Sequence, residues 1–175
     1  MLGLIGLVAA AQLSAPACPI DRAVYRLHGA PAFTAGFARQ DKRKAFASDL
    51  AFWLKTPKRT FWFSFGASNG YGGTWIATDT DPDRSAASPE PLEIQDPPDG
   101  EAPVLIDFDA FASDLAPLRA PPRAGDPPPA LLFARGLGAA LWYDWVSLAG
   151  GDETAVQEQM PAPLFEAAEC REEAG

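Results

Sequence analysis

The chain has 175 residues, 47% of them hydrophobic, and a formal net charge of −9, which allows one domain with a full hydrophobic core. An acidic protein repels nucleic acid at long range, so we exclude nucleic-acid binding. Two cysteines and one histidine, His28, are too few for a Cys/His metal cluster, and we expect no cofactor.

Residues 1–17 have the features of a secretory signal peptide. The run from Met1 to Ala11 is apolar but too short to span a bilayer, and small residues suited to signal-peptidase cleavage follow it. Cleavage after Ala11 and cleavage after Ala17 both satisfy the small-residue rule. One feature is atypical, since no basic residue precedes Asp21. We expect an exported protein, periplasmic or extracellular, with no transmembrane segment in the mature chain.

The only two cysteines, Cys18 and Cys170, lie near opposite ends of residues 18–175, which we predict to form a single β-rich domain. An oxidising compartment favours a disulfide between them. A lipid anchor on Cys18 is the competing interpretation. The preceding Ala15-Pro16-Ala17 resembles a lipoprotein signal only weakly, and an anchor would leave Cys170 unpaired. We therefore predict the disulfide.

Residues 23–78 have the alternation typical of β-strands. Period-two patterns predict strands over 23–27 and 33–37, separated by a break at Gly29-Ala30-Pro31. Residues 50–78 predict a three-stranded antiparallel meander. Its first turn is centred on Pro57-Lys58, and its second on Asn69-Gly70, a strong two-residue hairpin signal.

Tight turns fix the register of this meander and therefore its two faces. A two-residue first turn pairs Trp53 with Trp62, and a two-residue second turn pairs Ser64 with Trp75. One face is then wholly apolar and is predicted to be core. Its residues are Leu50, Phe52, Leu54, Phe61, Phe63, Phe65 and Ile76. The three tryptophans fall on the opposite face, among small and polar residues.

Two interpretations of the tryptophan face remain open. Trp53, Trp62 and Trp75 have flat rings that suit stacking on a sugar ring or another apolar ligand surface, and Tyr71 at the second turn is a further candidate contact. Alternatively, the C-terminal half covers the face and buries the rings. We prefer the second interpretation, because large exposed aromatic patches are rare on proteins without partners.

Residues 79–103 are rich in proline and acid, which predicts a long loop. Asp79, Asp81 and Asp83 occupy the first, third and fifth positions of a calcium loop, but Arg84 replaces its required glycine, so an acidic solvated loop is preferred. The loop begins a charge division. Residues 16–78 carry nine Lys or Arg and three acids, whereas residues 79–175 carry five and twenty. We expect the acidic part to pack against the basic part.

The remaining segments complete a β-rich pattern. Residues 104–108 predict a strand, and residues 117–129 a second proline-rich loop. Asp107 and Asp109 share one side of that strand and are candidate carboxylates for a hydrolase. Residues 130–146 fit either a hairpin or a helix, and two internal glycines favour the hairpin. Residues 162–169 predict a short helix that returns Cys170 to Cys18.

Together these features predict a mainly β fold: an antiparallel β-sandwich or partly closed barrel with long proline-rich loops and a short C-terminal helix. The predicted function is non-catalytic. We expect an exported protein that binds a ligand or partner through the tryptophan face. The alternatives are a small carboxylate-dependent hydrolase and a purely structural envelope domain.

Overall fold

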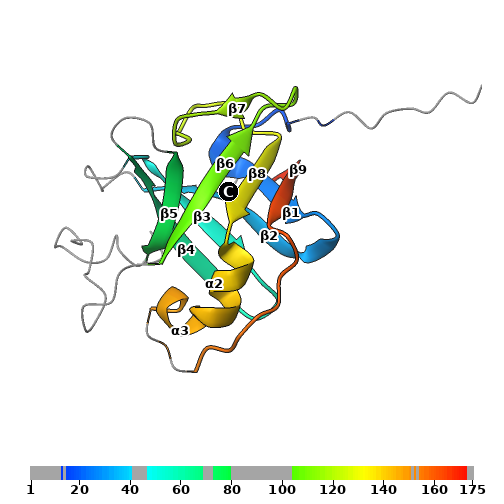
Figure 1. The fold of residues 1–175 in the computed structure, drawn as a ribbon. Coiled ribbons are helices and arrows are strands. Elements are labelled where there is room, and N and C mark those ends of the chain that lie inside the picture. The colour runs from blue at the N-terminus through cyan, green and yellow to red at the C-terminus, as the bar shows by residue number, and fades with distance from the viewer. Residues whose placement is uncertain are drawn as a thin grey trace, which may run out of the picture.

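The computed structural model describes residues 13, 15–40, 47–68, 73–79, 104–150, 152 and 154–172. These residues form nine strands, a 3-10 turn and two short helices (Figure 1). The strands are β1 (Ala23–Leu27), β2 (Ala30–Arg39), β3 (Leu50–Lys55), β4 (Thr60–Ala67), β5 (Thr74–Asp79), β6 (Leu105–Phe111), β7 (Pro117–Leu118), β8 (Leu131–Arg135) and β9 (Leu164–Cys170). The helical elements are η1 (Ile20–Arg22), α2 (Leu137–Tyr143) and α3 (Trp145–Leu148).

The sheet closes on itself into an antiparallel barrel. Its order is β5-β4-β3-β2-β1-β9-β8-β6-β7, and pairing of β5 with β6 closes eight strands, with β7 added beside β6. The helices α2 and α3 lie at one end of the barrel and β7 at the other (Figure 1). The predicted fold class is therefore confirmed in its barrel form, and the barrel is closed.

The register of the meander agrees with the first predicted turn and differs at the second. Trp53 pairs with Trp62 across β3 and β4, as predicted. Across β4 and β5, Trp75 pairs with Gly66 rather than with Ser64. The strand bounds leave residues 68–73 between β4 and β5, so the connection is longer than two residues. Because the displacement is two residues, each side chain stays on its predicted face.

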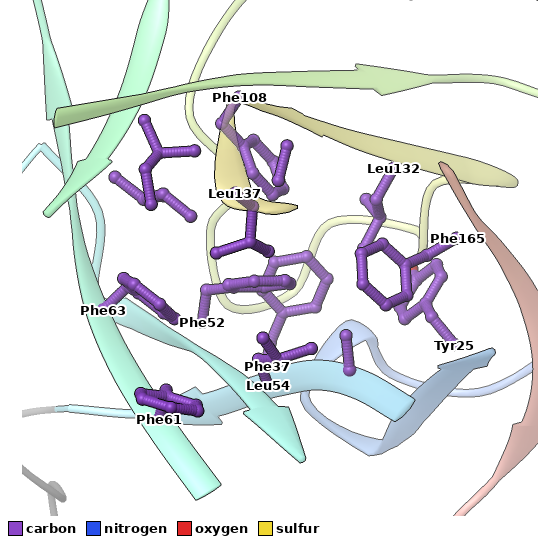
Figure 2. Packing of buried hydrophobic residues seen from close by; sticks show 14 of the residues in the cluster. Tyr25, Phe37, Phe52, Leu54, Phe61, Phe63, Phe108, Leu132, Leu137 and Phe165 are labelled. Atoms are coloured by element: carbon purple, nitrogen blue, oxygen red, sulfur yellow. The ribbon is translucent and has the colours of Figure 1, made fainter. Parts of the chain in front are cut away.

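Aromatic side chains fill the interior of the barrel. The predicted apolar face of the meander points inward, and each of its seven residues is at most 4% exposed. Phe108 of β6 contacts this layer from the facing wall, with ring centroids 5.3 Å from Phe52 and 5.1 Å from Phe65 (Figure 2). Leu137 of α2 reaches into the same cluster and seals it at the helical end (Figure 2).

Two predicted elements near the C-terminus are wrong. Residues 130–146 do not form a hairpin, because Gly136, at φ of 90°, turns the chain from β8 into α2. Residues 162–169 are not a helix. They belong largely to β9, which lies between β1 and β8 and completes the barrel wall. The short helices near the C-terminus are α2 and α3.

The two ends of the chain are joined as predicted. Cys18 and Cys170 form a disulfide with their Cα atoms 6.2 Å apart. The acidic part also contacts the basic part through the ion pairs Arg26–Glu169 and Arg59–Asp152 and through a hydrogen bond between His28 and Glu166. The acidic residues of these contacts belong to β9 in the barrel wall and to the segment that follows α3. Within the described residues, no helix is long and apolar enough to cross a membrane.

Candidate functional site

The outward surface of β3–β6 around Trp53, Trp62 and Trp75 is the candidate site, and we call it the outer tryptophan face. Strand alternation brings these three residues to the outside of the barrel, opposite the phenylalanine interior. Trp53 is only 8% exposed, whereas Trp62 and Trp75 are partly exposed. Trp53 and Trp62 are direct cross-strand neighbours, and Trp75 lies on the next strand.

Two of the three indole rings lie flat over a glycine of the neighbouring strand. Trp53 pairs with Gly36, and Trp75 pairs with Gly66. A Cβ atom added to Gly36 would lie 2.5 Å from Cζ2 of Trp53, and one added to Gly66 would lie 2.0 Å from Cζ2 of Trp75. Each ring therefore occupies the space that a side chain would otherwise fill. Aromatic rings that cover strand glycines in this way stabilise a sheet.

The outer side of Trp53 is closed by Arg171, which follows β9. The Arg171 guanidinium carbon lies 5.4 Å from the centroid of the Trp53 ring. The same guanidinium donates a hydrogen bond to the carbonyl oxygen of Phe37 at 2.9 Å, and the indole Nε1 of Trp53 donates to that oxygen at 3.3 Å. Trp53 is thus enclosed between Gly36 and Arg171, whereas Trp62 and Trp75 are partly exposed.

Charged side chains border Trp75. Asp107 of β6 is its direct neighbour on the strand opposite Gly66. Arg135 of β8 lies between Asp107 and Asp109, with nitrogen–oxygen distances of 3.7 Å and 3.1 Å respectively. Leu105, two residues before Asp107 on β6 and therefore on the same side of the strand, is 55% exposed. The result is a flat ring beside two carboxylates and one guanidinium, all facing outward.

Asp107 and Asp109 lie on the same side of the strand, as predicted. They form an exposed ion-pair cluster with Arg135. Both side chains are more than a third exposed and both contact the same guanidinium. His28 is paired as well, with Nδ1 2.6 Å from Oε1 of Glu166 on β9.

Several predicted candidates lie outside the described residues, namely Tyr71, Asp81 and Asp83. Asp79 is described, ends β5 and faces Trp62 across the strands. Within the described part of the chain, no group of three or more His, Cys, Asp or Glu side chains is arranged to hold a metal ion.

An open pocket of about 300 Å³ is lined mostly by residues of the second proline-rich loop. It is lined by Ile20, Ala110, Leu118, Arg119, Ala120, Pro121, Pro122, Asp126, Pro127 and Pro129. The loop is fastened by hydrogen bonds to its carbonyl oxygens, from Tyr25 to Pro129 at 3.1 Å and from Ser48 to Pro122. Burial raises the pKa of the Tyr25 phenol, which keeps it a hydrogen-bond donor.

The residues that sequence reasoning missed are the partners of the tryptophans: Gly36, Gly66, Arg135 and Arg171. Glycines inside strand-like segments, opposite an aromatic residue, were the available signal for the first two. Arg135 and Arg171 come from other segments of the sequence: the pairing of β8 with β6 places Arg135 beside Asp107, and β9, which pairs with β1, brings Arg171 to Trp53.

Comparisons of this chain with protein-family models, with curated proteins and with solved structures give no significant match.

Proposed function

We propose that the mature chain is an exported, non-catalytic protein that binds a ligand or partner through the outer tryptophan face. One observation carries the proposal: Trp62 and Trp75 are partly exposed on the outer wall of a barrel whose interior is filled. Large aromatic side chains in contact with solvent are a typical feature of binding surfaces.

The filled interior supports an external site. Eight-stranded barrels either fill their interior with side chains or hold one small ligand there. Here Phe37, Phe52, Phe65 and Phe108 contact one another across the interior, with ring centroids 5.1 to 6.2 Å apart. A ligand for this barrel is therefore expected on the wall or at an end.

Export is supported by the disulfide, which is consistent with an oxidising compartment. A periplasmic or extracellular location follows from the signal-like residues 1–17. The sulfur of Cys18 is bonded to Cys170, and it is not free in that state to carry a thioether-linked lipid. This favours release from the membrane after cleavage over a lipid anchor.

A purely structural envelope domain is the alternative that the geometry favours next. Trp53 and Trp75 each cover a strand glycine, and this packing needs no ligand. The hydrolase alternative receives less support, because Asp107 and Asp109 share Arg135 on an exposed surface. A change at Trp62 can distinguish a binding role of the face from a purely structural one, because the Trp62 ring covers none of the described glycines.

The test is calorimetric titration of the mature protein with a panel of neutral oligosaccharides, phospholipid micelles and short peptides. We expect Trp62→Ala to abolish binding of the active panel member while the fold is kept, as judged by circular dichroism. Trp142→Ala is the control, because Trp142 is 42% exposed but lies on α2 at the barrel end. Leu118→Trp, which enlarges a residue that lines the open pocket, is expected to have no effect. Binding that survives Trp62→Ala would place the ligand away from Trp62, and no binding at all would support the structural alternative.

A further inference from the structure

The arrangement of a tryptophan over a glycine occurs twice in the barrel wall, and one copy holds a bound group. Trp53 lies on Gly36, and its outer side carries the guanidinium of Arg171 at 5.4 Å. Trp75 lies on Gly66 in the same manner. Among the described residues, no guanidinium or ammonium group lies over the Trp75 ring. The Trp53 copy therefore shows which kind of group the outer side of such a ring accepts.

The surroundings of Trp75 favour a positive charge. Asp107 is its cross-strand neighbour, and Asp109 is the next outward residue on the same strand. Arg135 is the cation that these two carboxylates share, and it is closer to Asp109 at 3.1 Å than to Asp107 at 3.7 Å. Asp107 therefore keeps more of its capacity to accept hydrogen bonds. The net charge of −9 for the whole chain also attracts a positively charged group.

We propose that Trp75 and Asp107 form a subsite for an arginine side chain of a basic partner protein. The inference rests on the proposed function and gives the chemistry of the partner. The guanidinium stacks on the outer side of Trp75, as Arg171 does on Trp53, and donates hydrogen bonds to the carboxylate of Asp107. Arginine suits this site better than lysine, because its planar group stacks on aromatic rings and donates in a fixed fork.

An anionic partner is disfavoured by the two carboxylates and by the acidic net charge. A neutral sugar also stacks on a flat indole, but it gains nothing from the local negative charge. Charge complementarity therefore selects the basic partner, and a sugar remains an outcome that the experiment detects.

The experiment titrates the mature protein with two blocked heptapeptides, Gly-Arg-Gly-Arg-Gly-Arg-Gly and its lysine counterpart. We expect the arginine peptide to bind more tightly than the lysine peptide at equal charge. Trp75→Leu keeps an apolar side chain over Gly66, and it is expected to weaken arginine-peptide binding roughly two- to fivefold. Trp142→Leu, with the same change of side chain on α2, is expected to leave binding unchanged.

A second variant and a second readout distinguish a specific loss of binding from misfolding of the variant. Asp107→Asn changes a side chain that is 67% exposed and should fold normally, yet it is expected to weaken binding of the arginine peptide. In two-dimensional NMR spectra, the indole N–H signal of Trp75 should shift on titration, and that of Trp142 should not.

Equal binding of the two peptides, unchanged in Trp75→Leu, would overturn the inference and show bulk charge attraction only. If a neutral oligosaccharide binds with dependence on Trp62 while the arginine peptide shows no dependence on Trp75, the inference fails and the proposed function stands. If all binding is intact both in Trp62→Ala and in Trp75→Leu, the proposed function fails as well.

Discussion

At the scale of single residues, the tryptophans of the outer face have a structural reason to lie where they do. A glycine in a strand leaves its backbone uncovered and weakens the sheet. Trp53 and Trp75 cover Gly36 and Gly66, and each ring thereby presents its other side outward. The same packing that stabilises the wall also prepares a flat surface for a partner. At Trp53 that surface is used within the chain, by Arg171.

Gly66→Ala tests this packing. The new Cβ would overlap the Trp75 ring, so the indole must leave its position, and we expect the free energy of unfolding to fall by about 1–3 kcal/mol. Urea denaturation measures the change. Gly73→Ala is the matched control, because no heavy atom lies within 4 Å of the added Cβ. Equal stability of the two variants would show that Trp75 does not lie on Gly66.

At the scale of elements, α2 decides how one end of the barrel is closed. Leu137, Ala140 and Leu141 are buried and follow the three- and four-residue spacing of a helix, while Tyr143 is 78% exposed. The chain enters the helix at Gly136, whose positive φ is unfavourable for other residues. This short amphipathic helix seals the phenylalanine interior.

Leu141→Ala measures the contribution of that seal. Removing a fully buried leucine side chain leaves a cavity, and we expect a loss of about 2–5 kcal/mol in the free energy of unfolding. Tyr143→Ala, on the exposed side of the same helix, should change stability by less than about 0.5 kcal/mol. A small effect of Leu141→Ala in denaturant titrations would indicate that α2 is not packed into the barrel end.

The segment after α3 fastens the turn between β3 and β4. Arg59 pairs with Asp152 at 3.1 Å, Thr56 bonds the buried Glu158 at 2.6 Å, and Lys58 donates to the carbonyl oxygen of Gln157 at 2.9 Å. Here the basic and acidic halves of the chain meet. Complementary charges thus act between a hairpin turn and a loop that are distant in the sequence.

The pH dependence of this contact follows from Asp152. Hydrogen bonds from the side chain and backbone of Thr154 hold the pKa of Asp152 below its ordinary value of 3.8, and Arg59 adds to the effect. A lowered pKa stabilises the fold above pH 3.8, and the stabilisation is lost as the pH falls through the folded-state value. We expect Asp152→Ala to be slightly less stable than the parent at pH 7, and we expect this difference to shrink as the pH falls below 3.8. Thermal unfolding across this range measures the difference, and a pH-independent difference would contradict the assignment.

The elements that the sequence predicts well are those fixed by local turns. Pro57 and Lys58 sit in a tight turn, so the pairing of Trp53 with Trp62 follows from counting residues. The second connection is longer than Asn69-Gly70 alone suggests, which displaces the pairing without exchanging the faces. The strand β9 was missed because its alanines and glutamates give weak local signals, and its pairing with β1 joins residues far apart in the sequence. The same distance hides the placement of Arg171 on Trp53.

At the scale of the whole molecule, closure of the barrel depends on the two ends of the chain. The pairing of β1 with β9 joins the first strand to the last, and the disulfide between Cys18 and Cys170 lies beside this seam. The bridge spans 152 positions of the sequence, so one covalent loop contains every strand of the barrel. Such a loop limits the freedom of the unfolded chain.

Removing the bridge should therefore destabilise the protein strongly. For Cys18→Ser together with Cys170→Ser, the chain-entropy relation gives a loss of about 5 kcal/mol as an upper value. Guanidinium denaturation of the double variant, compared with the oxidised parent, measures the loss. Treating the parent with a reductant should give the same stability as the double variant. A parent that is insensitive to reduction would show that the β1–β9 seam holds without the bridge.

The central claim is that Trp62 and Trp75 project from a filled barrel and are open to solvent. The most direct measurement is NMR line broadening of the five indole N–H signals by a soluble nitroxide radical. We predict strong broadening for Trp142, intermediate broadening for Trp62 and Trp75, and protection of Trp53, whose Nε1 donates to the Phe37 carbonyl beneath Arg171. Protection of Trp62 and Trp75 equal to that of Trp53 would contradict the claim.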